Sequence, residues 1–397
     1  MERTTAKKNK YEIDMCNGTI MDKLISFSLP LMLSGILQLM FNAVDIIVVG
    51  RFSGSQALAA VGSTSALINV FTNLFIGISL GANVLTARFY AAGREKEVSE
   101  TVHTAITLAL VSGIIMALVG LVFSKGALAL MGTPDDVIGL SALYMRIYFL
   151  GMPFFMLYNY GAAILRAVGD TKRPLLFLMI AGVINACLNM VLVIVFKLGV
   201  AGVAIATVIS QMISCVLVLR CLCRSESSYR LCFSELGMKG YYLKQIFSVG
   251  VPAGIQSTVI NFSNVLLQSS VNSFGSTAMA GYTAANNLLG FLYVSVNSIT
   301  QACMSFTSQN YGVGKLKRMD RVLADCMILS VVVAVVLGCI CYGFGPEILQ
   351  IYTEDAEVIA CGMEILAYTT ITYFLCGWMD LFPGALRGMG YSAVPMV

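Results

Sequence analysis

The strongest constraint on the fold is an internal repeat with a separation of 221 residues. The stretch 164–174 recurs as 385–395, with an arginine, a glycine and a proline in matching places. Tyr90 and Tyr311, far upstream, keep the same separation. Several chemically distinctive residues at one offset indicate that a unit of roughly 220 residues is used twice.

The chain has the composition of a membrane protein. Hydrophobic residues make up 58% of it and charged residues only 12%, whereas about 25% of the residues in a soluble domain are charged. Residues 245–314 contain no Lys, Arg, Asp or Glu. Since a membrane-spanning helix needs about 20 apolar residues, this run is long enough for two spans with a turn near Gly275. The sequence therefore predicts an all-α integral membrane protein.

Apolar runs separated by polar or charged turns predict ten spans. They cover about 24–49, 57–87, 102–123, 137–163, 175–196 and 199–219 in the first unit, two helices within 245–314, and about 326–344 and 358–384 in the second unit. We therefore expect a polar cytoplasmic tail over 1–20, an N lobe over 21–219, a charged cytoplasmic linker over 220–244 and a C lobe over 245–397.

The repeat also predicts two spans that the sequence does not contain. In the first unit two spans follow the motif at 164–174, whereas the second copy, 385–395, is followed by only two residues. The expected fold is two six-helix bundles, twelve spans in all, with about ten present and the last two of the C lobe missing, a C-terminal truncation. An even number of spans per unit relates the bundles by a pseudo-twofold axis along the membrane normal, as in parallel-repeat transporters.

Lysine and arginine are distributed unequally between the two sides of the membrane. With the ten spans above, 21 of the 25 Lys and Arg residues lie on the side of the N-terminus and the linker, three lie on the other side, and Arg146 lies within a span. Because loops rich in Lys and Arg stay in the cytoplasm, we expect a multi-pass protein of the cell (inner) membrane with a cytoplasmic N-terminus.

A set of motifs in the chain resembles the multidrug and toxic compound extrusion (MATE) family of cation-coupled drug antiporters, of bacterial type. The matching residues are Pro30, Asn42 and Asp45 in the first span, Arg166 and Arg387 in the two copies of the repeated motif, and the stretch 199–204 that opens the sixth span. The similarity covers the chain from Ile20 onward. It implies a secondary antiporter that exports organic, cationic, drug-like compounds in exchange for H⁺ or Na⁺ by alternating access, without a further cofactor.

Asp45 is the principal candidate for the coupling site. A carboxylate inside a membrane is costly unless it faces a cavity or a partner, so such residues are mostly functional. The alternative is a structural carboxylate paired with Arg51. The resemblance implies that Asn185, Asn189 and Thr207 complete a cation site with Asp45, although Asn189 stands where one branch of the family has a second aspartate, and an amide cannot titrate. For both asparagines, hydrogen bonding between helices is the alternative.

The C lobe contains a second titratable candidate, Asp380. It lies seven residues before Arg387, so it either takes part in coupling or pairs with that arginine. Arg146, the charged residue of the fourth span, either pairs with an acid or extends to the membrane surface, and we expect a structural role for it.

A drug-binding cavity should have apolar walls with a few polar points. The first and eighth spans supply residues of this kind: Gln38, Met40, Phe41, Tyr282, Asn286, Tyr293, Asn297 and Gln301. For any one of them, ordinary packing or contact with lipid is the alternative.

Two other classes of function make different demands on the sequence. A flippase for a lipid-linked precursor, from the same superfamily, would need several cationic residues in its cleft, and the predicted spans contain only Arg146. An intramembrane enzyme would need paired acids, a histidine-rich metal set or a serine–histidine pair, which the spans lack. Most of the twelve cysteines lie in apolar runs, so we expect no metal site. We expect a monomer whose partners are a small organic substrate and the lipid bilayer, not a nucleic acid.

Overall fold

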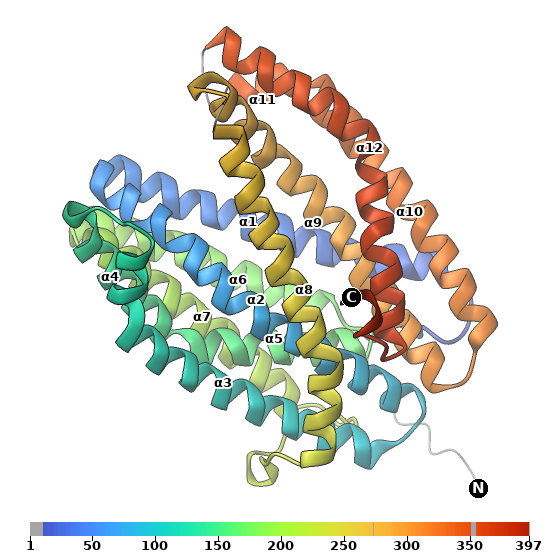
Figure 1. The fold of residues 1–397 in the computed structure, drawn as a ribbon. Coiled ribbons are helices and arrows are strands. Elements are labelled where there is room, and N and C mark those ends of the chain that lie inside the picture. The colour runs from blue at the N-terminus through green and yellow to red at the C-terminus, as the bar shows by residue number, and fades with distance from the viewer. Residues whose placement is uncertain (1–10, 273, 351–354, 397) are drawn as a thin grey trace, which may run out of the picture.

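The computed structural model describes residues 11–272, 274–350 and 355–396, and every regular element within them is a helix (Figure 1). In chain order the elements are α1 (Met21–Phe52), α2 (Ser55–Ala91), α3 (Glu95–Leu130), α4 (Asp135–Leu150), α5 (Met152–Ala167), α6 (Lys172–Asn189), the π-helix η1 (Met190–Val195), α7 (Gly199–Cys223), the 3-10 helix η2 (Phe233–Glu235), α8 (Gly240–Asn272), α9 (Ser276–Gly312), α10 (Leu316–Gly343), α11 (Gly345–Gln350), α12 (Ala356–Gly388) and the 3-10 helix η3 (Val394–Met396). The all-α class is confirmed.

Helices lie at the positions of all ten predicted spans. By length and apolar composition, six are able to cross a membrane: α1, α2, α3, α6 together with η1, α7 and α10. Two bent spans add to these, because α4 and α5 meet at 48° and the two halves of α12 meet at 52°. The helices α8 and α9 are 33 and 37 residues long, but Ser, Thr, Asn and Gln recur along both, so their described residues are less apolar than those of the six spans above.

The fourth predicted span, 137–163, is two helices rather than one. The helix α4 ends at Leu150 and α5 begins at Met152, with Gly151 between them. Pro153 follows at once and has no backbone N–H to donate to the preceding turn, so a continuous helix would lose a hydrogen bond there. The bend is therefore encoded locally, although the apolar pattern runs through it.

The repeat is visible in the backbone as well as in the sequence. Three pairs of glycines with positive φ keep the 221-residue separation: Gly54 and Gly275 (+87° and +97°), Gly93 and Gly314 (+69° and +74°), and Gly169 and Gly390 (+96° and +93°). Residues with a side chain rarely adopt such angles, so each pair marks a turn that both units need. The two units therefore turn at the same places between their helices.

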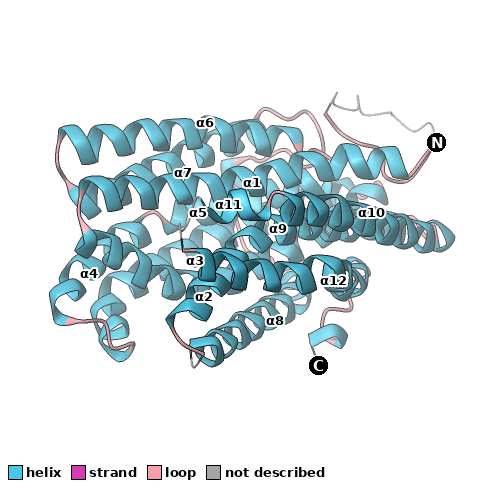
Figure 2. Ribbon diagram, turned by 90° about the horizontal axis from the view of Figure 1, so that it is seen from above, coloured by secondary structure: helices cyan, strands magenta, loops and turns pink. Residues whose placement is uncertain are grey.

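The helices form two groups, α1–α7 and α8–α12, which approach each other closely at one end of the molecule and diverge toward the other (Figure 1). We call the closely packed end the linker end, because the link between α7 and α8 lies there. Seen from above, α4 lies on one side of the molecule and α10 on the other (Figure 2). Between the groups, α2 packs along α8 and α9, and α1 packs along α9.

Glycines bring α2 and α8 into close contact. Gly77 and Gly81 on α2 face Gly250 and Gly254 on α8, two pairs with GxxxG spacing. A Cβ atom built on Gly77 would lie 2.4 Å from the Cα atom of Gly254, and one built on Gly250 would lie 2.4 Å from the Cα atom of Ile78. Small residues at this spacing allow helix backbones to approach closely inside a membrane. The α2–α8 contact therefore joins the two groups through backbone rather than through large side chains.

Reciprocal hydrogen bonds hold the two groups together at the linker end. Arg88 on α2 donates from Nη2 to the carbonyl oxygen of Met389 (2.8 Å). Gln309 on α9, at the position equivalent to Arg88 in the repeat, donates from Nε2 to the carbonyl oxygen of Ala167 (2.7 Å). The Arg88 guanidinium also lies over the Tyr311 ring, 4.9 Å from its centre. Two further bonds cross the same boundary, from Ser305 to Asn83 (3.2 Å) and from Ser308 to the carbonyl of Val84 (2.6 Å).

Residues 11–20, which precede α1, also join the two groups; we call them the N-terminal strap. Glu12 accepts a hydrogen bond from the hydroxyl of Tyr90 (2.8 Å) on α2, and Asn310 on α9 donates to the carbonyl oxygen of Met15 (3.1 Å). Further bonds to the strap come from Tyr229, Lys315 and Arg318. Met15 is fully buried. The described part of the expected tail over 1–20 is therefore packed against both groups.

Candidate functional site

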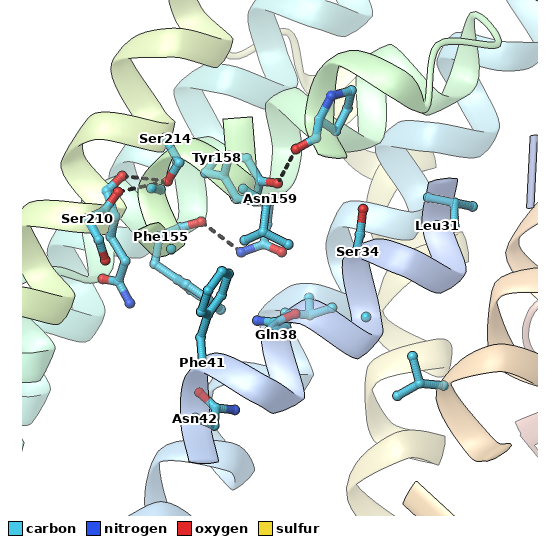
Figure 3. A pocket seen from close by; sticks show the side chains of 18 of the residues that line it. Leu31, Ser34, Gln38, Phe41, Asn42, Phe155, Tyr158, Asn159, Ser210 and Ser214 are labelled. Carbon is cyan, nitrogen blue, oxygen red and sulfur yellow. Dashed lines mark hydrogen bonds between the residues drawn. The ribbon is translucent and has the colours of Figure 1, made fainter. Parts of the chain in front are cut away.

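A cavity of about 410 Å³ lies among the helices of the first group and is bounded on one side by α9. On α1 its lining residues recur every three or four positions, from Leu31 to Asp45, as expected of one helix face. Figure 3 shows Ser34 and Gln38 of α1 on one side of the cavity and Asn159 of α5 on the other. Because the contacts between the groups lie at the linker end, that end of the cavity is closed.

Five of the eight predicted cavity residues line this cavity. They are Gln38, Phe41, Tyr293, Asn297 and Gln301. Met40 lies on another face of α1 and is 52% exposed. Tyr282 and Asn286 lie nearer the start of α9, where the two groups have diverged, and they do not line the cavity.

The four predicted residues of the N-lobe cation site come together from three helices. The amide nitrogen of Asn189 on α6 donates a short hydrogen bond to Oδ1 of Asp45 on α1. The same nitrogen lies 3.1 Å from Oδ1 of Asn185, one helical turn earlier. The Thr207 hydroxyl on α7 also faces the Asp45 carboxylate. Within the described residues no ion pair joins Asp45 to Arg51, so its neighbours in the structure are polar and uncharged.

The oxygen atoms at this place suit a small cation. The Oδ1 atom of Asn189 is buried and has no hydrogen-bond partner among the described residues. It lies on a residue that contacts both Asp45 and Asn185, whose side-chain oxygens are also acceptors. A carboxylate with amide and hydroxyl oxygens is a ligand set for a hard cation, and the carboxylate alone can accept a proton. The arrangement is chemically able to bind either H⁺ or Na⁺.

Arg166 lines the cavity, although the sequence marked it only as part of the repeated motif at 164–174. It lies in the last turn of α5 and its side chain lines the cavity at the linker end. The signal that would have found it is helical spacing: Phe155, Asn159 and Arg166 follow one another at intervals of four and seven residues, and all three line the cavity.

The C-lobe candidate lies apart from this group. Asp380 on α12 is half-buried and does not line the cavity. Arg387, two turns further along α12, donates from Nη2 to Oε1 of Gln256 on α8 (2.5 Å). Arg146 on α4 is exposed on the outside of the first group. The structure thus brings Asp45 together with Asn185, Asn189 and Thr207, but not with Asp380.

Known proteins resemble this chain over most of its length. A family model described as MatE matches residues 30–191 and 252–397. The probable multidrug resistance protein YoeA of Bacillus subtilis is 33% identical over 380 residues, which cover 94% of this chain and 82% of that protein. The multidrug export protein MepA of Staphylococcus aureus is 23% identical over 371 residues, which cover 92% of this chain and 81% of that protein.

Solved structures share the fold. An outward-facing conformation of a multidrug resistance MATE family transporter of the MOP superfamily matches with a TM-score of 0.92 at 20% identity, covering 98% of this chain and 87% of that one. A MATE transporter in a bent conformation matches with a TM-score of 0.87 at 20% identity, covering 94% and 83%. At these identities the likeness is one of fold.

Proposed function

Because the chain belongs to the MatE family of multidrug efflux transporters, we propose that it is a secondary antiporter that exports organic cations in exchange for H⁺ or Na⁺. The observation that carries this proposal is the Asp45 carboxylate, which lines a cavity and is surrounded by the uncharged side chains of Asn185, Asn189 and Thr207. An intramembrane acid without a cationic partner is suited to binding a cation reversibly.

In the proposed cycle, the coupling cation and the substrate favour different states of the two helix groups. A ligand shifts a conformational equilibrium only through its different affinity for the two states. Asp45 provides such a difference, because it either binds the coupling cation or faces the cationic group of a compound in the same cavity. The linker end is closed here by the bonds of Arg88 and Gln309, and export requires a second state in which these bonds are broken.

We further propose that the linker end faces the cytoplasm of a bacterial cell. The support is the excess of Lys and Arg on that side, in the linker and in the loops that follow α2, α5 and α9. In this orientation the observed cavity would release its compound to the outside. A monomer contains the whole cavity, which is lined by residues of one chain.

A flippase for a lipid-linked precursor is favoured by one observation, the Arg166 side chain in the cavity. A pyrophosphate carries several negative charges and would need more than one cation. Among the described residues that line the cavity, Arg166 is the only Lys or Arg. We therefore keep the antiporter as the proposed function.

The test is efflux from proteoliposomes under a proton gradient alone and then under a sodium gradient alone. The wild type should export a cationic dye under at least one of them, and Asp45→Asn should reduce the rate at least tenfold, because the amide preserves shape but carries no charge. Asp136→Asn, at an exposed position on α4, is the matched control and should leave the rate unchanged. Equal rates for Asp45→Asn and the wild type would exclude Asp45 as the coupling residue.

A further inference from the structure

Arg166 places a positive charge on the lining of the cavity. Its guanidinium lines the cavity near the linker end, and in the part of the chain that the structure describes it has neither an ion pair nor a hydrogen-bond partner. A cation inside a bilayer is costly and normally pairs with an acid or with backbone carbonyls. The cavity therefore contains a guanidinium whose donors are free.

The repeat provides a comparison in the other lobe. Arg387 is the counterpart of Arg166, and it donates a hydrogen bond of 2.5 Å to Gln256. Asp380 precedes Arg387 by seven residues and so lies on the same face of α12, two turns away. Arg387 thus has both an amide acceptor and an acid on its own helix face.

The corresponding positions in the N lobe lack these groups. By the 221-residue separation, Asn159 stands in place of Asp380. Counted from the matching prolines Pro30 and Pro252, which are 222 residues apart, Ser34 stands in place of Gln256. Both side chains donate to the backbone of their own helices at 2.8 Å. Ser34 donates to the carbonyl of Pro30, and Asn159 donates to that of Phe155 (Figure 3). Neither carries a charge. The difference between the lobes leaves Arg166 without the acid that its counterpart has.

We propose that Arg166 is the anion-recognition residue of the cavity and binds a carboxylate of the exported compound. This rests on the proposed export function and narrows its substrate class to amphipathic zwitterions. The carboxylate lies at Arg166, near the linker end, and the cationic group lies toward Asp45, at the other end of the lining face of α1. A guanidinium binds a carboxylate through two parallel hydrogen bonds, which suits this role.

The side chains that line the cavity suit the body of such a compound. The lining face of α1 extends over 15 residues, from Leu31 to Asp45, or about 21 Å of helix. Aromatic side chains line the cavity between its ends: Phe41, Tyr144, Tyr148, Phe155 and Tyr158. Rings of this kind pack against a flat apolar body. The cavity is thus acidic at one end, aromatic along its walls and basic at the other end.

The test compares two xanthene dyes that differ at one group, a free carboxylate in one and its ethyl ester in the other. Binding of each to the purified protein in neutral detergent is measured by fluorescence polarisation. Arg166→Gln should weaken binding of the acid dye by about tenfold to a hundredfold, the range for one charge-assisted interaction, and leave the ester within about twofold. Arg166→Lys, which keeps the charge, should recover part of the loss.

Arg146→Gln is the matched control, because it removes an exposed arginine of the same lobe, and it should bind both dyes as the wild type does. The proposal is overturned if Arg166→Gln weakens both dyes equally, since the residue would then be structural. It is also overturned if the wild type binds the acid dye no better than the ester. A third contrary result is displacement of the acid dye by phosphatidylglycerol micelles but not by phosphatidylcholine micelles, which would assign Arg166 to a lipid phosphate.

The dye measurement is independent of transport. If the acid dye binds through Arg166 but proteoliposomes export neither dye under a proton or a sodium gradient, the anion site stands and the export function fails. If both dyes are exported and Arg166→Gln changes neither rate nor affinity, the export function stands and the anion site fails.

Discussion

At the level of single residues, the Asp45 carboxylate accepts a hydrogen bond from Asn189. Asn189 is fully buried, and its amide nitrogen bonds both the carboxylate and Asn185. An aspartate at this position would place two carboxylates in contact, whereas the amide supplies a donor. Asn189 therefore orients the acid rather than sharing its titration.

We predict that Asn189→Ala will reduce cation-coupled dye efflux by roughly tenfold or more, because a hydrogen bond to a charged group is worth about 1.5–3 kcal/mol. Asn69→Ala removes an exposed asparagine of the same lobe and should leave efflux unchanged. The readout is the initial rate of efflux at matched protein levels. A normal rate in Asn189→Ala would show that Asp45 works without this donor.

Much of this site was predictable from the sequence, and the reason is physical. Polar residues are so rare within apolar helices that Asp45, Asn185 and Thr207 stand out, and family resemblance groups them. Arg166 was missed because it lies at a helix end, where charged residues are ordinary. Met40 was wrongly assigned to the cavity because composition does not specify which face of α1 points inward. The helical spacing of Ser34, Gln38 and Asp45 does specify that face, and Met40 does not lie on it.

At the level of helices, apolar runs locate the spans but not their partners. The predicted spans coincide with helices, and most of these helices are longer than the predicted spans by a few residues or a turn or two. The reason is that the backbone hydrogen bonds of a helix continue into the polar residues beyond the apolar run. The bend at Gly151 and the π-helix η1 do not alter the apolar pattern, so the pattern alone does not predict them. The close approach of α2 and α8 depends on four glycines whose pairing is a tertiary property.

We predict that Gly77→Ala will lower the melting temperature of the detergent-purified protein by several degrees. Its Cβ would meet the backbone of Gly254, which cannot move aside as a side chain can, and overpacking of this kind costs about 1–3 kcal/mol. Gly62→Ala lies on the same helix with nothing within 4 Å of the new Cβ. It should leave the melting temperature equal or higher, because alanine favours a helix over glycine. Equal melting of the two variants would contradict the close α2–α8 contact.

At the level of the whole molecule, closure of the linker end depends on contacts of two kinds. Direct bonds join the two helix groups, and the N-terminal strap contacts both groups at once. Glu12 joins the strap to the first group and Arg318 joins it to the second. Loss of the strap contacts should therefore favour separation of the groups at this end.

We predict that the double variant Glu12→Ala, Arg318→Ala will increase hydrogen–deuterium exchange in peptides around 83–90 and 305–312. Each lost hydrogen bond is worth about 1 kcal/mol, which corresponds to roughly fivefold in an opening equilibrium. Lys317→Ala removes a neighbouring exposed charge and should leave exchange unchanged. If the double variant exchanged as the wild type does, the direct bonds between the groups would be enough to keep the linker end closed.

The strap also sets an order of events during synthesis. It precedes α1, yet Arg318, which bonds it to the second group, is made 303 residues after Met15. At about 5–20 residues per second, the ribosome needs about 15–60 s to cover that distance. For most of that interval the strap lacks its bonding partners in the second group, including Asn310 and Arg318, so the linker end of a newly made molecule closes only after α9 has emerged.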